Sequence, residues 1–494
     1  MDVLGRPAAL ESQAGAGARM RRLLWTLIAI ALVARIATLG LYPLMDNTEA
    51  RYAEVARKML ETGDWVTPQF RYGVPFWSKP PAAVWVTAAS MGVFGVNEFA
   101  ARLPALLCCI GIAALAWQLA RRTLGADVAV HAVAVLATTA LFFVAAGAVM
   151  TDAQLTLGTM LSMTAFYMAV RGDPARRRLW GYAFFVGLAI GLLAKGPVGV
   201  VLTAVPTGLW TIWRRAYGDV WRRIPWITGT LLCAALALPW YLLAEQRTPG
   251  FIEYFIVGEH WKRYTVAGWD GDMFGTAHAQ PRGLIWPLAI LSTLPWCAVW
   301  VFLAWSRRRA KEPPAPWTDG GDLRAYLVLW MLTPAVFFTF AGNILFTYVL
   351  PGLPAFAILV AHCWNGLAES TVWRRAVKYH ALIVPLGAAA AILIVVPRLA
   401  PTFTQQDLAA RYVAARASPA ESIVYYREAP HSAEFYLRGK TKTAATRDDL
   451  ARYLAAPGRT FFVVKQNELE DLAELRAGTE EVARSGRFRL LVKK

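Results

Sequence analysis

The sequence predicts an α-helical polytopic membrane protein of about eleven to thirteen transmembrane helices, followed by a small α/β domain outside the bilayer. Hydrophobic residues make up 57% of the 494 positions, whereas soluble domains contain roughly 45–50% apolar residues. These residues form runs long enough to cross a bilayer. Near residue 400 the long runs stop and short, alternating patterns replace them. Most of the chain is therefore expected to lie in lipid.

The first transmembrane run covers residues 23–41. It follows a polar, Ala- and Gly-rich segment, residues 1–22, which we expect to be disordered and cytoplasmic. A cleaved signal peptide is the competing interpretation, but the apolar run continues well past its small-residue site. Ten further runs complete a transmembrane domain over residues 23–399. They are 103–120, 128–148, 153–170, 179–194, 197–213, 225–244, 284–305, 325–341, 344–363 and 379–397.

Basic residues assign the loops to the two sides of the membrane. Counted from a cytoplasmic N-terminus, the Arg and Lys clusters fall in cytoplasmic loops, as the positive-inside rule requires. These clusters lie near residues 121–122, 171–178, 214–223, 307–311 and 374–378. The outer side then holds a loop at 42–102, a second loop at 245–283 and the C-terminal tail. The net charge of +18 is thus explained by the basic residues of the cytoplasmic loops. Nucleic-acid binding is not expected, because no basic stretch alternates with aromatic residues on a soluble face.

The tail, residues 400–494, is predicted to form the α/β domain. Segments 422–426, 460–465 and 488–492 have the composition of strands. Segments 405–416, 447–455 and 468–477 have helical spacing. We expect this domain to lie outside the membrane, on the same side as the two long loops.

Several functional classes are disfavoured by what the sequence contains. The five cysteines lie in apolar runs without metal-site spacing, so we expect small buried side chains and no disulfide framework. The sequence has no P-loop and no GxGxxG motif. No internal repeat is apparent, which weakens a transporter built from inverted repeats.

The loop at 42–102 carries the first candidate functional residues. Asp46 and Glu49 follow the first span, where charged groups beside a bilayer are costly unless they serve a function. Residues 47–60 have helical spacing, and these acids could simply face water on an interfacial helix. The alternative is that Asp46 acts as a general base or as an electrostatic group.

Residues 73–81 of the same loop hold Lys79 between Ser78 and two prolines. The prolines restrict the backbone at this point. A lysine held where the chain meets the bilayer suits a phosphate on a lipid headgroup. A lysine that snorkels from a helix start is the simpler alternative.

Five other residues place polar groups on the same predicted side. Asp152 and Lys195 each lie between two apolar runs and could form a structural ion pair or contribute to a site. His260 and Arg263 lie in a charged stretch of the second loop, and Tyr348 opens a later span. Together these residues suit chemistry on a lipid-linked, phosphate-containing substrate, because fixed cations stabilise a phosphate leaving group.

The order of these motifs resembles the polyprenyl-phosphate-dependent glycosyltransferases of the GT-C type. Bacterial lipid A 4-amino-4-deoxy-arabinose transferases are the nearer likeness, and protein O-mannosyltransferases the more distant one. The resemblance covers residues 25 to about 365 and, more weakly, the tail. Its most specific parts are Asp46-x-x-Glu49-x-Arg51-Tyr52, residues 73–81 and residues 94–104, followed by Thr151-Asp152, Lys195-Gly196-Pro197, Glu259-His260 with Arg263, and residues 347–351.

The resemblance implies an inverting transfer from an undecaprenyl-phosphate sugar at the periplasmic face of the bacterial inner membrane. The catalytic acids would be Asp46, Glu49 and Asp152. The residues that would bind the donor and its phosphate are Lys79, Lys195, Arg263, Tyr348, Arg51 and Tyr52. The family usually has Glu before this Lys-Pro pair, often as part of a metal site, and this chain has Ser78. A divalent metal at His260 would lack that ligand.

The resemblance favours transfer of an amino sugar, such as 4-amino-4-deoxy-arabinose, to lipid A phosphate. A protein Ser/Thr hydroxyl or an envelope glycan is the alternative acceptor. A flippase for lipid-linked sugars is a rival of another class, but it should bury charge at mid-membrane, whereas Asp152 and Lys195 lie at turns.

Overall fold

The structure is a computed structural model that describes residues 6–46, 48–274, 279–310, 317, 321–364 and 371–494. The chain divides into two compact units. The first unit comprises Met1–Ala37, Pro75–Ala83 and Arg102–Ala389. The second comprises Thr38–Val74, Val84–Ala101 and Ala390–Lys494.

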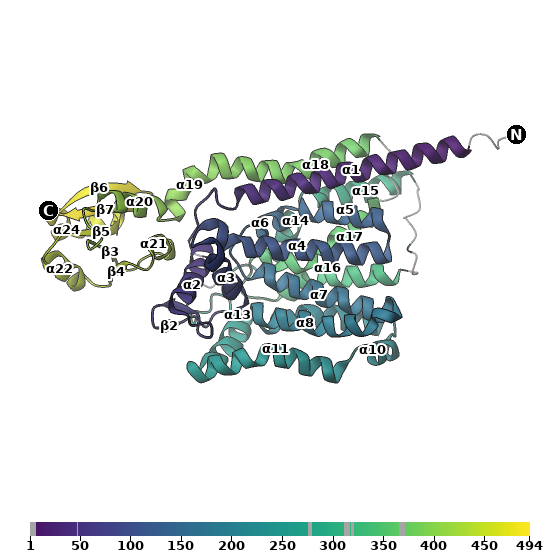
Figure 1. The fold of residues 1–494 in the computed structure, drawn as a ribbon, viewed down its shortest axis with the longest axis horizontal. Helices are drawn as coiled ribbons and strands as arrows, with labels where there is room; N and C mark the ends of the chain where they lie inside the picture. The colour runs from purple at the N-terminus through teal and green to yellow at the C-terminus, as the bar shows by residue number, and fades with distance from the viewer. Residues whose placement is uncertain (1–5, 47, 275–278, 311–316, 318–320, 365–370) are drawn as a thin grey trace. The chain divides into compact units, whose positions relative to one another are not determined.

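The first unit is almost entirely helical (Figure 1). Helices occur at every predicted span that falls within it. They are α1 (Arg6–Thr38), α4 (Glu98–Thr123), α5 (Ala126–Ala137), α6 (Ala140–Ala145), α7 (Asp152–Arg171), η1 (Pro174–Arg176), α8 (Arg177–Lys195), α9 (Pro197–Trp213), α10 (Tyr217–Arg223), α11 (Trp226–Arg247), α12 (Phe251–Glu253), η2 (Tyr254–Lys262), α13 (Arg263–Thr265), α14 (Ile285–Ser292), α15 (Trp296–Ala310), α16 (Asp322–Thr339), η3 (Phe346–Gly352), α17 (Leu353–Trp364) and α18 (Thr371–Ala390).

Five helices among the described residues are long and apolar enough to cross a membrane. A sixth span arises if α14 and α15, which meet at 91°, are counted as one. Two expected single spans are each divided into two helices. Span 128–148 is interrupted between α5 and α6, and span 284–305 is interrupted between α14 and α15. Pro295 lies in the second interruption, and a proline ring cannot continue a helix. The fold is thus helical and of the membrane type, and the number of eleven spans stays a prediction.

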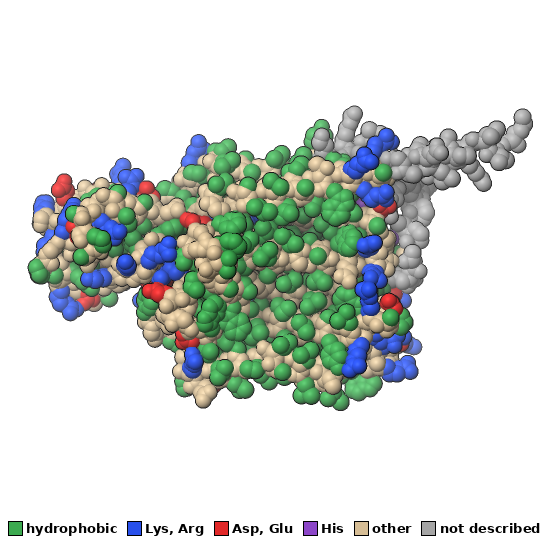
Figure 2. Space-filling model, in the orientation of Figure 1, with side chains coloured by type: hydrophobic (Ala, Val, Ile, Leu, Met, Phe, Trp, Pro, Cys, Tyr) green, Lys and Arg blue, Asp and Glu red, His purple; other side chains and the backbone are tan. Residues whose placement is uncertain are grey.

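The basic ends of several helices meet at one end of the first unit. Arg171 at the end of α7 contacts Asp219 of α10 at 2.7 Å and Asp322 of α16 at 2.8 Å. Arg214, just after α9, also binds Asp322. Figure 2 shows Lys and Arg side chains gathered at the end that bears α10, while hydrophobic side chains dominate the visible faces of the helices. Two of the loops assigned to the cytoplasmic side, 171–178 and 214–223, therefore lie together.

One prediction about the N-terminus is wrong. Residues 1–22 were expected to be disordered, but α1 begins at Arg6. The Ala-rich composition explains the difference, since alanine has the highest helix propensity, and the segment continues directly into an apolar helix. Residues 1–5 lie outside the described part of the chain, as does Asn47, where a helix was expected to begin.

The second unit combines short helices with a five-stranded sheet. From the 42–102 loop it takes α2 (Glu49–Thr62), a hairpin of β1 (Gln69–Arg71) and β2 (Val74–Pro75), and α3 (Ala82–Phe94), although Pro75, Ala82 and Ala83 belong to the first unit. From the tail it takes η5 (Ala391–Val395), α19 (Val396–Phe403), α20 (Gln406–Ala415), β3 (Ser422–Tyr426), α21 (His431–Tyr436), β4 (Thr441–Ala444), α22 (Arg447–Ala455), β5 (Thr460–Lys465), α23 (Gln466–Leu469), α24 (Ala473–Gly478), β6 (Thr479–Ser485) and β7 (Phe488–Lys493).

The sheet has the order β4-β3-β5-β7-β6. The first three strands run parallel, and β7 pairs antiparallel with β5 and β6. Consecutive residues of β5, such as Phe461 and Phe462, enter two separate cores on opposite faces of the sheet. This is expected for a sheet covered by helices on both sides. The predicted β3 and β5 have the observed bounds, while β4, β6 and α21 were not predicted.

The 42–102 loop is joined to the tail by buried charges. In α2, Arg57 contacts Glu54 at 2.7 Å, and Lys58 contacts Glu434 of α21 at 2.8 Å. Because an unpaired buried charge is costly, these contacts hold α2 and α21 in a defined arrangement. They place the segment that follows α1 beside the α/β domain.

Candidate functional site

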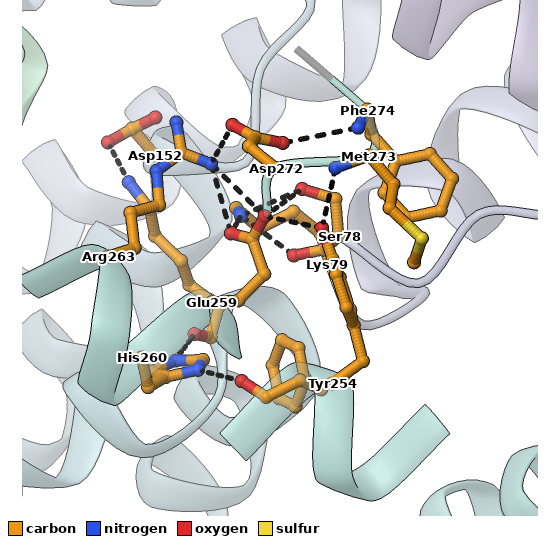
Figure 3. A network of polar contacts seen from close by, with 12 residues as sticks. Ser78, Lys79, Asp152, Tyr254, Glu259, His260, Arg263, Asp272, Met273 and Phe274 are labelled. Atoms are coloured by element: carbon orange, nitrogen blue, oxygen red, sulfur yellow. Dashed lines mark hydrogen bonds and ion pairs between the residues drawn. The ribbon is translucent and has the colours of Figure 1, made fainter. Parts of the chain in front are cut away.

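Two cations and one buried carboxylate form the centre of the polar cluster in the first unit (Figure 3). The ammonium of Lys79 lies 2.7 Å from Oε2 of Glu259. The guanidinium of Arg263 approaches both oxygens of Glu259 at 3.1 Å. Lys79 comes from the Pro-rich segment, whereas Glu259 and Arg263 come from consecutive turns after α12. The expected pair of Lys79 and Arg263 is therefore brought together, around a third residue.

The Glu259 carboxylate is almost completely buried, with a side-chain exposure of 1%. Burial alone would raise the pKa of Glu259, but the positive charges of Lys79 and Arg263 hold this pKa below its ordinary value. The carboxylate is thus ionised at neutral pH. It orients two cations whose side chains remain 16% exposed.

A π-helix carries Glu259. The segment η2 (Tyr254–Lys262) has the i to i+5 pattern, which is rare and often marks functional positions. It packs closely on the turn between α8 and α9. Gly196 in that turn has a φ of 77°, and a Cβ there would lie 2.6 Å from the ring of Phe255. Only glycine permits both the backbone conformation and this close approach.

Ser78 occupies the position at which the resemblance departs from its family. Its hydroxyl donates to Oε1 of Glu259 at 3.2 Å and accepts from the Lys79 ammonium at 3.1 Å. A glutamate at this position would place a second carboxylate beside Glu259. Serine instead bridges the acid and the lysine without adding charge.

Asp152 and Lys195 form a second ion pair in the same unit. Asp152 begins α7, Lys195 ends α8, and the two side chains meet at 2.7 Å. The Lys195 ammonium also lies 4.6 Å from the centre of the Tyr348 ring, a cation–π contact. The ion pair expected as one alternative is present. Within this ion pair, Lys195 still contacts Tyr348. The pair can therefore be structural and contribute to a site at the same time.

His260 does not have the surroundings of a metal ligand. Its Nδ1 lies 2.7 Å from the carbonyl oxygen of Phe255, and its Nε2 lies 3.0 Å from that of Lys195. A metal would require one ring nitrogen to turn away from its carbonyl partner. Within the part of the chain that the structure describes, no group of three or more His, Cys, Asp or Glu side chains is placed to hold a metal ion. The residues present do not fit a metal site.

Two residues that the sequence did not single out support Arg263. Asp272 binds its guanidinium at 3.0 Å. Asn343 donates to the carbonyl oxygens of Arg263 at 2.5 Å and Val266 at 3.0 Å. Glu259 was also left out of the expected site, although it stands in the same charged stretch as His260. The run Gly258 to Tyr264 was the available signal for Glu259, but no local pattern pointed to Asp272 or Asn343.

Asp46, the expected catalytic acid, belongs to the second unit. Its Oδ1 accepts a hydrogen bond from the backbone N–H of Ser432 at 2.9 Å, and its Oδ2 accepts from the Ser432 hydroxyl. Burial raises the pKa of Asp46 to about 6, although both hydrogen bonds from Ser432 oppose this shift. The carboxyl group therefore changes charge close to neutral pH.

The other expected residues of the 42–102 loop lie near the start of α2. Glu49 is the first residue of this helix, where a negative charge is favourable. Arg51 lies 5.5 Å from the centre of the Tyr52 ring. The expected site residues thus fall into two groups. One group is Asp46, Glu49, Arg51 and Tyr52 of the second unit, and the other is Lys79, Asp152, Lys195, His260, Arg263 and Tyr348 of the first.

Comparison with known proteins supports the resemblance seen in the sequence. Residues 23–255 match the family described as dolichyl-phosphate-mannose-protein mannosyltransferase. The crystal structure of ArnT from Cupriavidus metallidurans bound to undecaprenyl phosphate matches with a TM-score of 0.78 and 23% identity. The match covers 94% of this chain and 97% of that chain. The chain has the ArnT fold.

Its sequence also resembles curated relatives of ArnT. An undecaprenyl phosphate-alpha-4-amino-4-deoxy-L-arabinose arabinosyl transferase from Pseudomonas fluorescens is 32% identical over 331 residues, or 65% of this chain and 54% of that protein. The corresponding protein from Edwardsiella ictaluri is 31% identical over 361 residues, which are 71% of this chain and 61% of that protein. The matched region thus spans only 54% and 61% of the length of these two relatives. The expected resemblance to ArnT-like enzymes is confirmed.

Proposed function

We propose that the chain is an integral membrane glycosyltransferase. It transfers an amino sugar, such as 4-amino-4-deoxy-arabinose, from an undecaprenyl-phosphate donor to lipid A phosphate. The resemblance to the arabinosyl transferases and the ArnT fold support this function. The membrane-type fold supports an integral protein. We further propose the inner membrane as its location and the periplasmic side as its catalytic face.

The observation that carries the proposal is the convergence of Lys79 and Arg263 at the Glu259 carboxylate. In the transfer, the bond between the anomeric carbon and the carrier phosphate breaks as a bond to an acceptor oxygen forms. The electron pair remains on the carrier phosphate, which gains negative charge. Preorganised cations stabilise that charge. A guanidinium has five N–H groups, so Arg263 can serve a carboxylate and a phosphate together.

Lys195 and Tyr348 are proposed to extend this phosphate site. Their direct contact orients the ammonium over an aromatic ring, while Asp152 fixes its position. In this proposal Asp152 acts on the donor through Lys195. We also propose roles for three residues of the 42–102 loop. Arg51 and Tyr52 would bind the donor, and Glu49 would be a catalytic acid.

The role of Asp46 depends on the acceptor. A lipid A phosphate is already ionised and requires no general base, so Asp46 would orient the reacting groups. A protein or glycan hydroxyl must lose a proton, and Asp46 would then serve as the base. Its pKa of about 6 is compatible with proton acceptance near neutral pH.

We propose that the reaction needs no metal, because the Ser78 hydroxyl donates to Glu259 and both ring nitrogens of His260 face backbone carbonyl oxygens. Purified enzyme treated with a strong chelator should keep its full transfer rate. Loss of activity on chelation, with recovery on adding back one divalent ion, would contradict this.

Mass spectrometry of lipid A tests the function as a whole. Lipid A is compared between cells that express the chain, cells that lack it and cells that express Arg263→Ala. A mass increase equal to one amino sugar, present only with the unaltered chain, is the expected result. Unchanged lipid A together with newly glycosylated envelope proteins would contradict the lipid A acceptor and favour a Ser/Thr hydroxyl.

A further inference from the structure

The short segment that carries Asp46 is hydrogen-bonded to the tail domain, and all the residues involved belong to the second unit. The backbone N–H of Asp46 donates to the carbonyl oxygen of Phe403 at 2.8 Å. The N–H of Leu44, which is fully buried, donates to the Tyr436 hydroxyl at 2.9 Å. The Asp46 carboxylate accepts two further bonds from Ser432. The tail therefore fixes both the backbone and the side chain of the proposed catalytic acid.

Helix α21 provides the contacts to the Asp46 side chain and to Leu44 from one face. Ser432 and Tyr436 are four residues apart on this helix, and residues with that spacing lie on the same side. Ser432 is fully buried. A single turn of the tail thus contacts Asp46 and the residue two positions before it.

The Ser432 hydroxyl has a fixed direction. It accepts the backbone N–H of Gln405 at 2.9 Å, and an N–H group can only donate, so the hydroxyl proton is directed at Oδ2 of Asp46. The backbone N–H of Ser432 binds the other carboxylate oxygen at 2.9 Å. A carboxylate has about four lone-pair positions, so about two stay open to a reacting group. Ser432 therefore orients the acid without occupying it completely.

The Tyr436 hydroxyl is directed in the same way. It accepts from Leu44 and donates to Oε1 of Glu98 at 2.9 Å. Nε2 of Gln406 donates to the same oxygen at 2.9 Å. The hydroxyl of Tyr436 therefore links the Asp46 segment to the start of α4, and it cannot rotate without breaking one of these bonds.

Attachment of the tail does not by itself require contacts at Asp46. The ion pair between Lys58 and Glu434 already joins α2 to α21. The bonds from Ser432 and Tyr436 add a defined position for one carboxyl group. Such definition matters for a reacting group, because a misplacement of about 1 Å can slow a reaction about a hundredfold.

We propose that Ser432 and Tyr436 are positioning residues for the transfer reaction. They hold Asp46 in the direction in which it meets the reacting groups, and this gives the tail domain a role in catalysis. The proposal rests on the proposed function, in which Asp46 takes part in the transfer. Neither residue touches the substrate. The carrier phosphate is assigned to Lys79 and Arg263, so the loss of Ser432 or Tyr436 should affect turnover and not donor binding.

Tyr436→Phe in the full-length purified chain tests this role, because it removes the hydroxyl and keeps the ring that packs against Phe435. The assay follows release of undecaprenyl phosphate from undecaprenyl-phosphate 4-amino-4-deoxy-arabinose, which accompanies transfer to any acceptor. We expect kcat to fall about tenfold, because the buried N–H of Leu44 loses its acceptor and Asp46 shifts. KM for the donor should stay unchanged. Hydrogen exchange at residues 42–46 should become faster.

Ser432→Ala is the second variant and should show the same division between kcat and KM, since it loses the hydroxyl bond to Asp46. Tyr453→Phe is the matched control. Tyr453 is a partly buried tyrosine of the same domain that packs against the core on the other face of the sheet, whereas Tyr436 packs against the first core. Its replacement should leave kcat, KM and hydrogen exchange unchanged.

Two results would overturn the positioning role alone. One is an unchanged kcat in both Tyr436→Phe and Ser432→Ala. The other is a kcat that falls only in proportion to the loss of folded protein, which would make these residues merely structural. A different result would overturn the proposed function, and this proposal with it: no release of undecaprenyl phosphate by the unaltered chain.

Discussion

At the scale of single residues, Glu259 determines how the cations of the first unit are arranged. A carboxylate this deeply buried is stable only when it is paired and hydrogen-bonded. Lys79, Arg263 and Ser78 all provide such contacts. Replacing any one partner should therefore affect both the stability of the chain and its ability to bind an anion.

Replacement of Lys79 by methionine separates these two effects. Lys79→Met should raise KM for the donor at least tenfold and lower the thermal stability, because Glu259 loses its nearest cation. The double variant Lys79→Met/Glu259→Gln should regain stability but not activity. Transfer rates and thermal unfolding of the purified protein measure both outcomes.

Lys262→Met is the matched control for this experiment, because Lys262 is a neighbouring but exposed lysine. It should leave KM and stability unchanged. A normal KM in Lys79→Met would remove Lys79 from the phosphate site.

Asp46 provides a prediction about pH. Its pKa is raised to about 6 in the folded chain, so the folded state binds this proton more tightly than the unfolded state. Its contribution to stability is therefore largest at low pH and is lost as the pH rises toward 6. If the reaction requires the charged form, the transfer rate should rise through the same pH range.

Ser432→Ala should move that rise to higher pH, because it removes a hydrogen bond that lowers the pKa of Asp46. The pH profile of kcat/KM provides the measurement. Ser418→Ala, in an exposed turn of the same domain, should leave the profile unchanged. An identical profile for Ser432→Ala would mean that the titration of Asp46 does not limit the reaction.

At the scale of elements, the π-helix η2 and the turn after it act as one support. His260 links η2 to the end of α8 through the Lys195 carbonyl oxygen. Asn343, just before η3, holds the turn that follows Arg263. These contacts join segments far apart in the sequence, so the positions of Lys195 and Arg263 depend on each other.

Asn343→Asp tests this support without changing the size of the side chain. Aspartate cannot donate the two hydrogen bonds to the carbonyl oxygens of Arg263 and Val266. We expect binding of undecaprenyl phosphate to weaken about tenfold, since each lost bond leaves a buried carbonyl oxygen without this donor. Titration of the purified chain with undecaprenyl phosphate gives the dissociation constant.

Asn343→Gln should bind better than Asn343→Asp, because it keeps the amide donors. Equal binding by the unaltered chain and Asn343→Asp would show that the turn does not position Arg263.

At the scale of the whole molecule, the regular elements were predictable and the site was only partly so. Apolar runs located the helices because hydrophobic length is a local property, and α9, α22, β3 and β5 have the expected bounds. The break between α14 and α15 was not predicted. Two short apolar helices that meet at a sharp angle have the same composition as one straight span.

The site required contacts that composition does not encode. Charge and motif order pointed to Lys79, Lys195 and Arg263, but Glu259 was missed as their common partner. Asp272 and Asn343 reach Arg263 only through folding of the second loop. The engagement of Asp46 by Ser432 was likewise unforeseen, because 386 residues separate them.

The orientation of the chain in the membrane is a prediction at this scale. In spheroplasts, a membrane-impermeant maleimide should label Ser418→Cys in the α/β domain but not Gly218→Cys in α10. Both positions are exposed, and the five native cysteines are buried or partly buried. Labelling of Gly218→Cys should appear only after lysis. The reverse pattern would contradict a periplasmic catalytic face.

The pairing of charges in the first unit has a consequence for competition between ligands. Lys79, Arg263 and Lys195 are balanced by three acids, namely Glu259, Asp272 and Asp152. A cluster without net charge does not concentrate free anions from solution, as a strongly positive cleft would. Inorganic phosphate should therefore compete poorly. A phosphate attached to a lipid tail is confined to the membrane and meets the cluster at a high effective concentration. Selection of the carrier then depends on delivery from the bilayer more than on attraction by charge.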